Sequence, residues 1–440
     1  GVPGNSKNVA MVLPRASKAK RSATSRGGRV QKRLFDDHAA TLRKAVKAGH
    51  IAGSCEIVFF KGREIFRKSF GMADLEAKVP FRDDTICRIY CQSKAYMNFT
   101  AMMLVDEGLL RLDAPVGDYI PSLRRLRVAD PGGKVKLARK QPKVRNLLTH
   151  SAGFSYGVDF NYPPDELQSR YKGLVEGIEQ GRVRSLAAFV DELGKIPLCF
   201  EPGKKYHYSY CTDVLGRVME VASGKPLDEL LRQRLFEPLG MCDTSFSVPR
   251  NKLSRLSGIY GNAMSWGHLN EGKKGAVPLA SKPGLVRIDG NSPAESAWSA
   301  PRVRVLSGGG LVGYNRGGLV STAQDTLAFV KMLLAGGLAP DGRRLMARAT
   351  LKKMEQNQLV GSWKEPGTRW CLLGDMQGGN LQQGGAAGNY WSMNRKKGWA
   401  IVHFMQQVDG EGWEDTDLDP EKAEIDQVVQ KVVTKAQKLR

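Results

Sequence analysis

The residues IYCQSKA at positions 89–95, followed by the apolar-periodic run from Tyr96 to Leu110, decide the fold of this chain. The run has the period of a buried helix, and Cys91 and Lys94 lie near its start. Residues three apart on a helix share one face, so this spacing brings a thiol and an amine together. A nucleophile needs a base or a cation at that distance. The structural alternative is that Cys91 is a small buried core residue and that its spacing from Lys94 arises by chance.

The composition is that of a folded protein, because 41% of the 440 residues are hydrophobic. No apolar run of about 18 residues is present, so no transmembrane segment is expected. The seven cysteines are scattered and contain no Cys-x-x-Cys pair. This usage argues against a disulfide framework and a zinc site, and it favours reduced thiols and an intracellular location. No cofactor and no metal are predicted.

The net charge of +23 is concentrated in part at the N-terminus, where residues 1–34 contain nine basic residues and no acid. A basic, serine-containing, acid-free segment resembles an organellar transit segment, which would direct the protein to a plastid or mitochondrion rather than leave it in the cytoplasm. The alternative, at even weight, is a disordered basic arm that contacts a polyanion. Both interpretations predict that residues 1–34 lie outside the folded domain.

Strand patterns occur near both ends of the remaining chain. The apolar runs Cys55–Phe60 and Glu64–Phe70 flank a tight turn and predict a hairpin. Residues 370–407 alternate short apolar runs with glycine turns, which predicts further strands. The intervening chain is mainly helical in period. Its exception is the glycine-, serine- and proline-rich stretch at 247–318, a kind of irregular segment that usually lines or covers a site.

Strands at both ends with helices between them predict an α+β fold. It is an α/β sandwich in which the N- and C-terminal segments form one antiparallel sheet and a helical domain is inserted between them. We expect one domain over residues 35–410, with its helical subdomain at about 90–330. Residues 411–440 are predicted to form a C-terminal helix that packs on the sheet.

Further motifs occur in a fixed order along the chain. They are the opening hairpin at 51–74, NLLTHSAG at 146–153, EPG at 201–203 with YS at 208–209 and DVLG at 213–216, GKPL at 224–227 with FEPLGM at 236–241, GGLVSTA at 317–323 and GGAAG at 384–388. Together they resemble the serine β-lactamase/penicillin-binding-protein superfamily, in its branch of class C β-lactamase-related esterases and transesterases. The resemblance covers about residues 35–410 and implies a β-lactamase/transpeptidase-like fold.

The resemblance also implies catalytic roles. Cys91 stands where the family carries the serine of its Ser-x-x-Lys motif, and Lys94 stands at the lysine. Tyr208 aligns with the catalytic tyrosine, whose phenol serves as general base and then as general acid. The backbone N–H groups of Cys91 and Ala386 would form the oxyanion hole. Core packing is the structural alternative for Tyr208.

Substrate contacts are implied by the third family motif, which aligns with Gln383-Gly384-Gly385. The two glycines would let a substrate carbonyl approach the backbone. Gln383 cannot supply the charge that holds a β-lactam carboxylate, so antibiotics are not the expected substrates. Tyr162 and Trp391 are candidate pocket residues, with core packing as an equally weighted alternative.

Two other side chains near these motifs invite different chemistry. His150 could pair with a cysteine as in thiol proteases, but the resemblance places it in a structural turn. Ser93 could replace the nucleophile, yet it is adjacent to Lys94, and adjacent residues do not face each other on a helix.

The sequence therefore predicts a hydrolase or acyltransferase that acts on small ester or thioester substrates through an acyl-enzyme on Cys91. The retention of Lys94 and Tyr208 favours an active enzyme, because an inactive site has no need of either. The departures at Cys91 and Gln383 favour the alternative, a catalytically inactive relative that serves as a binding or scaffold module. An engineered Ser-to-Cys trap is the third interpretation.

Overall fold

The computed structural model describes residues 18–130, 133–157, 165–261, 285–287, 289, 318–358, 370–377, 379–408 and 431. The chain divides into two compact units, Gly1–Leu42 with Pro420–Arg440 and Arg43–Asp419. The described part of the first unit is helix α1 (Lys18–Ala48) as far as Leu42, together with residue 431. Residues 18–34, which composition assigns to a disordered leader, are thus helical. Lysine, arginine, alanine and glutamine are good helix formers, which accounts for this local structure.

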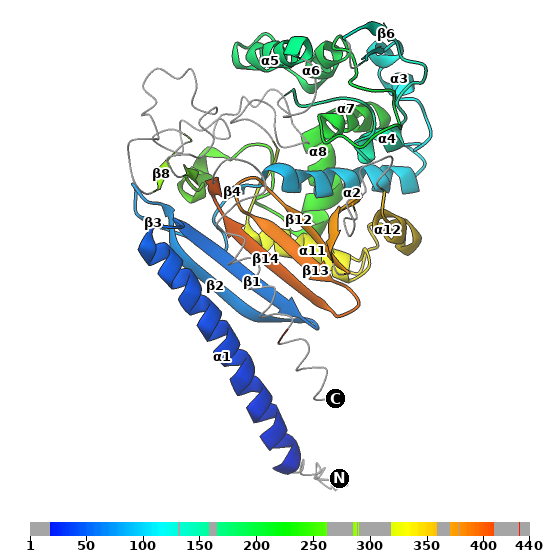
Figure 1. Cartoon of the computed structure of the whole chain (residues 1–440). Helices are drawn as coiled ribbons and strands as arrows, with labels where there is room; N and C mark the ends of the chain where they lie inside the picture. Colours follow the sequence, from blue (N-terminus) through cyan, green and yellow to red (C-terminus); the bar gives the residue numbers. More distant parts are fainter. Residues whose placement is uncertain are drawn as a thin grey trace, which may run out of the picture. The chain divides into compact units, whose positions relative to one another are not determined.

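The second unit is built on an eight-stranded antiparallel sheet with the order β10-β11-β12-β13-β14-β1-β2-β3 (Figure 1). Its strands are β1 (Gly53–Phe60), β2 (Arg63–Asp74), β3 (Val79–Pro80), β10 (Trp370–Cys371), β11 (Gly374–Gln377), β12 (Asn380–Gly384), β13 (Tyr390–Asn394) and β14 (Trp399–Met405). The N- and C-terminal segments meet where β1 pairs with β14, from Ser54↔Met405 to Phe60↔Trp399. The predicted fold class is confirmed.

The predicted hairpin is present as β1 and β2. The turn between them places Lys61 at φ 46° and Gly62 at φ 83°. Two successive residues with positive φ give the turn whose twist matches that of the flanking strands. Short pairs elsewhere are β4 (Cys87–Arg88) with β9 (Val320–Ser321), β5 (Arg127–Ala129) with β6 (Val135–Leu137), and β7 (Tyr260–Gly261) with β8 (Val286–Arg287) and β15 (Gln407–Val408).

Helices fill the sequence between the two halves of the sheet, as predicted. They are α2 (Ser93–Asp106), α3 (Val116–Tyr119), α4 (Val144–Leu148), α5 (Asp165–Glu179), α6 (Leu186–Leu193), α7 (Cys211–Ser223), α8 (Leu227–Leu231), α9 (Glu237–Leu239), α11 (Ala323–Leu334) and α12 (Arg348–Met354). Short 3₁₀ segments are η1 (Tyr90–Gln92), η2 (Pro121–Leu123) and η4 (Arg250–Arg255), and η3 (Arg232–Phe236) is a π-helical segment. No helix among the described residues is long and apolar enough to cross a membrane.

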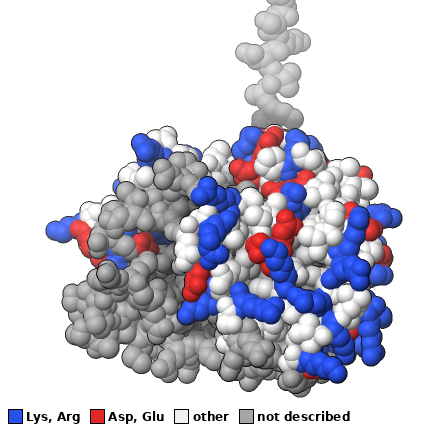
Figure 2. All heavy atoms as spheres, turned by 90° about the horizontal axis from the view of Figure 1, so that it is seen from above, with Lys and Arg blue, Asp and Glu red and all other residues white. Residues whose placement is uncertain are grey.

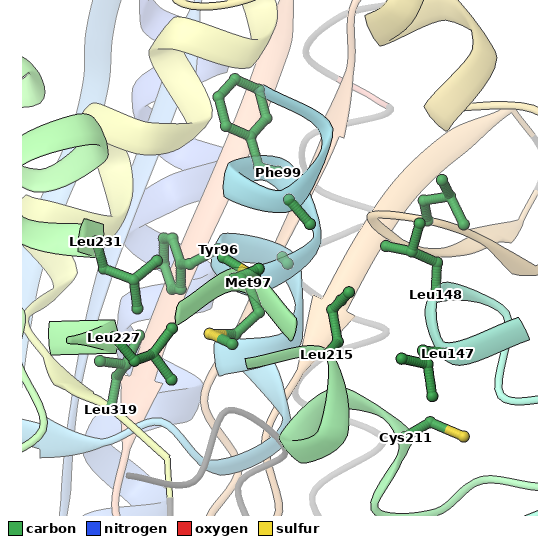
Figure 3. Packing of buried hydrophobic residues seen from close by; sticks show 14 of the residues in the cluster. Tyr96, Met97, Phe99, Leu147, Leu148, Cys211, Leu215, Leu227, Leu231 and Leu319 are labelled. Atoms are coloured by element: carbon green, nitrogen blue, oxygen red, sulfur yellow. The ribbon is translucent and has the colours of Figure 1, made fainter. Parts of the chain in front are cut away.

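Helix α2 lies at the centre of the hydrophobic core. Every residue from Ser93 to Leu104 is buried, and the helix packs against α7, α8 and α11 (Figure 3). The rings of Tyr96 and Phe329 are 4.5 Å apart between centroids, which joins α2 to α11. A helix buried on all sides cannot tilt or slide without opening cavities. The residues at its N-terminus are therefore held in fixed positions.

Candidate active site

Cys91 lies in the short turn η1, directly before α2, and is only 3% exposed. The preceding residue, Tyr90, has φ 43°, a left-handed conformation that is strained for a residue with a side chain. Such strain persists only where the surroundings enforce it, and it is found most often at functional sites. The turn thus gives the Cys91 backbone an orientation that a regular helix would not.

The backbone before Cys91 is held by side chains that flank the C-terminal strands. The Arg88 carbonyl accepts hydrogen bonds from Asn389 Nδ2 at 2.8 Å and from Gln406 Nε2 at 2.9 Å. The Arg88 N–H donates to Gln406 Oε1 at 2.9 Å. One residue further on, the Ile89 N–H donates to the Leu319 carbonyl at 3.0 Å. These bonds enforce the strained turn.

The Cys91 thiol is in hydrogen-bonding contact with the amine of Lys94 and with the phenol of Tyr208. One helical turn separates Cys91 from Lys94, as the spacing predicted. Tyr208 comes from the segment directly before α7, which packs against α2. The structure therefore brings together the three residues that the motifs singled out, although they are separated by up to 117 positions in the sequence.

Lys94 is 2% exposed, and burial lowers the pKa of its amine below the usual 10.5. The charges of Cys91 and Asp213 act in the opposite direction on this pKa. The Lys94 Nζ also lies 4.3 Å from the ring centroid of Tyr208 and 5.8 Å from that of Tyr156. A lysine with a lowered pKa provides neutral amine, the form that can accept a proton from a nucleophile.

Tyr208 is held by His150. The two ring centroids are 4.7 Å apart, and His150 Nδ1 accepts a hydrogen bond from the Ser209 N–H at 3.2 Å. His150 itself has φ 49°, in a turn. Burial lowers the pKa of His150 well below its usual value, so the ring is neutral. This geometry agrees with the structural role expected for His150.

Burial also raises the pKa of Tyr208 well above its usual range, and the nearby Cys91 adds to the effect. Tyr208 is therefore a neutral phenol at ordinary pH. A neutral phenol donates a proton more readily than it accepts one. Of the two predicted proton-transfer groups, Lys94 is the better base and Tyr208 the better acid.

The turn that follows β12 packs on the backbone of the segment that precedes Cys91. A Cβ at Gly385 would lie 2.3 Å from the Ile89 carbonyl oxygen, so only glycine fits there. The backbone hydrogen bonds of the described loops and turns include none donated by the N–H groups of Cys91 or Ala386. Both groups remain available for a substrate oxygen, which is the requirement of an oxyanion hole.

Gln383 lies on β12 beside Cys91 and is 7% exposed. Its Nε2 donates to the Cys91 carbonyl at 3.3 Å and to the Gly384 carbonyl at 3.1 Å. The amide thus supports the backbone at Cys91. This use of the side chain adds to the argument against recognition of a β-lactam carboxylate, because the amide donor is already engaged.

The other predicted residues have different surroundings. Trp391 is fully buried in the hydrophobic core, and the centroids of its ring and the ring of Phe329 in α11 are 6.2 Å apart. Core packing is therefore the interpretation that fits Trp391. Ser93 is buried, and its Oγ accepts a hydrogen bond from the Leu319 N–H at 2.9 Å. Tyr162 lies outside the described residues. Within the described ranges, no cluster of three or more His, Cys, Asp or Glu side chains could hold a metal ion.

Two residues of the site were not assigned a role from sequence. Asp213, in the first turn of α7, is fully buried and interacts electrostatically with Lys94. Tyr156 packs edge-on against Tyr208 at 5.7 Å, and its pKa is raised by burial and by the charges of Asp213 and Cys91. Asp213 begins the DVLG motif at 213–216, so its place near the site could have been predicted from that motif. Tyr156 follows a glycine turn and carries no periodic signal.

We expect Cys91 to be the first thiol alkylated by iodoacetamide at neutral pH. Its thiol contacts the Lys94 amine, a base that can accept the thiol proton during the reaction. Burial raises the pKa of Cys55, Cys211 and Cys371 to about 12, so these three thiols stay protonated. Cys242 is exposed and is the relevant competitor. Peptide mapping after timed labelling measures the order.

The matched control for this labelling is Lys94→Met, which should slow alkylation of Cys91 and leave that of Cys242 unchanged. Labelling of Cys91 at or below the rate of Cys242 in the unsubstituted protein would contradict activation of the thiol.

Comparison with known proteins agrees with this geometry. A family model described as Beta-lactamase matches residues 38–424, and the chain belongs to this family. The superfamily inferred from the motifs is thereby confirmed, whereas the role of Cys91 as nucleophile stays a prediction.

Two relatives and one solved structure illustrate the similarity. Protein Rv1367c of Mycobacterium tuberculosis (strain ATCC 25618 / H37Rv) is 30% identical over 334 residues, which cover 75% of this chain and 74% of that protein. Esterase EstB of Burkholderia gladioli is 35% identical over 211 residues, 47% of this chain and 50% of EstB. The structure of EstCE1, described as a hydrolase with promiscuous acyltransferase activity, matches with a TM-score of 0.68 at 23% identity, covering 91% of this chain and 99% of that one. The last similarity is one of fold.

Proposed function

We propose that this chain is an esterase or acyltransferase that forms a covalent acyl-enzyme on Cys91. The observation that carries the proposal is the contact of one thiol with both a buried lysine of lowered pKa and a neutral tyrosine. Similarity to a protein named as an esterase supports the same class of reaction. Because Lys94 and Tyr208 are retained around the thiol, an active enzyme is favoured over an inactive scaffold.

The first half of the reaction transfers an acyl group to the enzyme. Cys91 Sγ attacks the ester carbonyl carbon, and Lys94 accepts the thiol proton. The developing oxyanion is stabilised by the backbone N–H groups of Cys91 and Ala386. When the carbon–oxygen bond breaks, Tyr208 donates its proton to the leaving alkoxide and regains one from Lys94. The products are a thioester on Cys91 and a free alcohol.

The second half transfers the acyl group to water or to another alcohol. The acceptor oxygen attacks the thioester carbon, and its proton passes through Tyr208 and Lys94 to the departing sulfur. The carbon–sulfur bond breaks and the free thiol is restored. A thioester is attacked by many nucleophiles, so hydrolysis and acyl transfer are both open to this site, and the acceptor present decides between them.

We expect turnover of p-nitrophenyl butyrate to exceed that of nitrocefin by about 30- to 150-fold. The estimate reflects the loss of a charge-assisted contact to the β-lactam carboxylate, which is worth roughly 2–3 kcal/mol. Steady-state assays of both substrates on one preparation measure the ratio.

The result of this assay also separates the competing interpretations. A higher kcat/KM for nitrocefin would overturn the role assigned to Gln383. Absence of turnover with both substrates, and with a thioester donor, would favour the scaffold alternative.

A further inference from the structure

The hairpin β5–β6 projects from the helical part of the second unit (Figure 1). Its inner strand β5 is anchored, because Ala129 N–H donates to the Leu198 carbonyl at 2.9 Å and Leu198 N–H donates to the Arg127 carbonyl at 2.7 Å. Where the two strands are joined, Asp130 Oδ1 accepts a hydrogen bond from the Lys134 N–H at 2.9 Å. Within the described residues, β6 pairs with β5 and with no other strand. The hairpin therefore has β5 as its anchored inner strand and β6 as its outer strand.

Exposed aliphatic side chains gather on this outer strand. Val135 is 43% exposed and Leu137 is 53% exposed, the highest fraction of any large hydrophobic residue that the structure describes. The two residues alternate with Lys136, so both project from the same face of the strand. A folded chain leaves single apolar residues at its surface without consequence, but two on one three-residue strand form a patch.

Basic side chains surround this aliphatic pair. Residues 111–145 contain ten lysines and arginines against three aspartates. Arg125, Lys134, Lys136 and Lys140 are all exposed and, in the described part of the chain, form no salt bridge. Figure 2 views the molecule from above, and groups of blue lysine and arginine side chains lie on the part of this surface that is not grey.

Protection of a free sheet edge explains only part of this pattern. Lysines on an edge strand discourage pairing with another chain. An exposed valine and leucine have the opposite effect, since they favour association. The combination instead matches the surface of proteins that lie on membranes, where basic side chains contact anionic head groups and aliphatic side chains enter the boundary of the acyl chains.

We propose that the hairpin surface, defined as Arg125, Lys134, Val135, Lys136, Leu137 and Lys140, docks onto an anionic lipid bilayer. A nucleic acid is the less favoured partner, because single strands are bound largely by stacking on aromatic rings and this surface has none. An acidic protein would account for the lysines but not for the exposed valine and leucine. The proposal is independent of the chemistry at Cys91.

Co-sedimentation of the full chain with vesicles tests the proposal. Vesicles of phosphatidylcholine with phosphatidylserine should bind the protein, and vesicles of phosphatidylcholine alone should bind it weakly. The double substitution Lys134→Gln/Lys136→Gln should weaken partition to the anionic vesicles by about thirtyfold. The double substitution Val135→Ser/Leu137→Ser should weaken it by about tenfold and leave its dependence on salt unchanged.

Matched controls separate this surface from the general positive charge of the chain. Lys352→Gln/Lys353→Gln on α12 removes the same charge from other exposed positions, and Val221→Ser removes an apolar side chain that is 39% exposed. Both controls should bind vesicles as the unsubstituted protein does. Equal losses in the hairpin and control variants would overturn the proposal. So would hairpin variants that keep vesicle binding but lose binding to single-stranded RNA or to an acidic protein.

Discussion

Replacing Cys91 by alanine should lower kcat for p-nitrophenyl butyrate by on the order of 10⁴-fold, the scale seen when a nucleophile is removed from a covalent mechanism. The fold should survive, because the substitution removes one sulfur atom at the edge of the core and is expected to change the free energy of unfolding by about 1 kcal/mol. Stopped-flow or steady-state release of p-nitrophenol measures the rate, and a thermal melt checks the fold. Mass spectrometry of the unsubstituted protein should find the butyryl group on Cys91.

Two further variants make this result interpretable. Cys371→Ala removes a buried thiol from β10 and should leave kcat unchanged. Cys91→Ser places a hydroxyl beside Lys94 and Tyr208 and should retain activity well above that of Cys91→Ala. Full activity in Cys91→Ala would show that turnover does not pass through this residue.

Replacing Lys94 by methionine should lower kcat/KM by roughly 10³-fold, within the range attributed to general base catalysis. The pH dependence gives the sharper test. Because burial lowers the pKa of Lys94 below 10.5, the amine loses its proton at a lower pH than an exposed lysine does. Activity should therefore rise with pH through a limb that has its midpoint below that value, and Lys94→Met should lack this limb.

The charge and the basicity of Lys94 can be separated. Lys94→Arg keeps a permanent positive charge but cannot act as a base at these pH values. It should lose as much activity as Lys94→Met. Lys352→Met on α12 changes an exposed lysine and serves as the control. Activity in Lys94→Arg close to that of the unsubstituted protein, with the same pH profile, would assign Lys94 an electrostatic role instead.

The parts of the site that could be predicted from sequence are those encoded by short spacing. Cys91 and Lys94 are one helical turn apart, so their contact follows from helical geometry alone. The hairpin β1–β2 follows from two apolar runs around a glycine turn. Tyr208 could be placed only because an ordered set of motifs surrounds it. The family assignment rests on that order rather than on any single residue.

The residues that escaped prediction depend on long-range packing. Tyr156 reaches Tyr208 across 52 positions of sequence, and nothing in its local pattern indicates that contact. Trp391 was a pocket candidate with core packing as the alternative, and its ring packs against Phe329 of α11, a long-range contact that no local pattern indicates. The helix that begins at Lys18 was missed because charge composition was weighed above helix propensity.

The pairing of β1 with β14 has a consequence for how the chain is made. A ribosome releases Ser54 about 350 residues before Met405, its partner in the sheet. During that interval one edge of β1 has unpaired backbone N–H and C=O groups, and the side chains of Ile57, Val58 and Phe59 on its faces are apolar. Nascent chains with such edges aggregate or require chaperones. Asn389 and Gln406, whose side chains hold the Arg88 carbonyl, are also synthesised late. The contacts around Cys91 can therefore be completed only near the end of translation, when the C-terminal strands close the sheet.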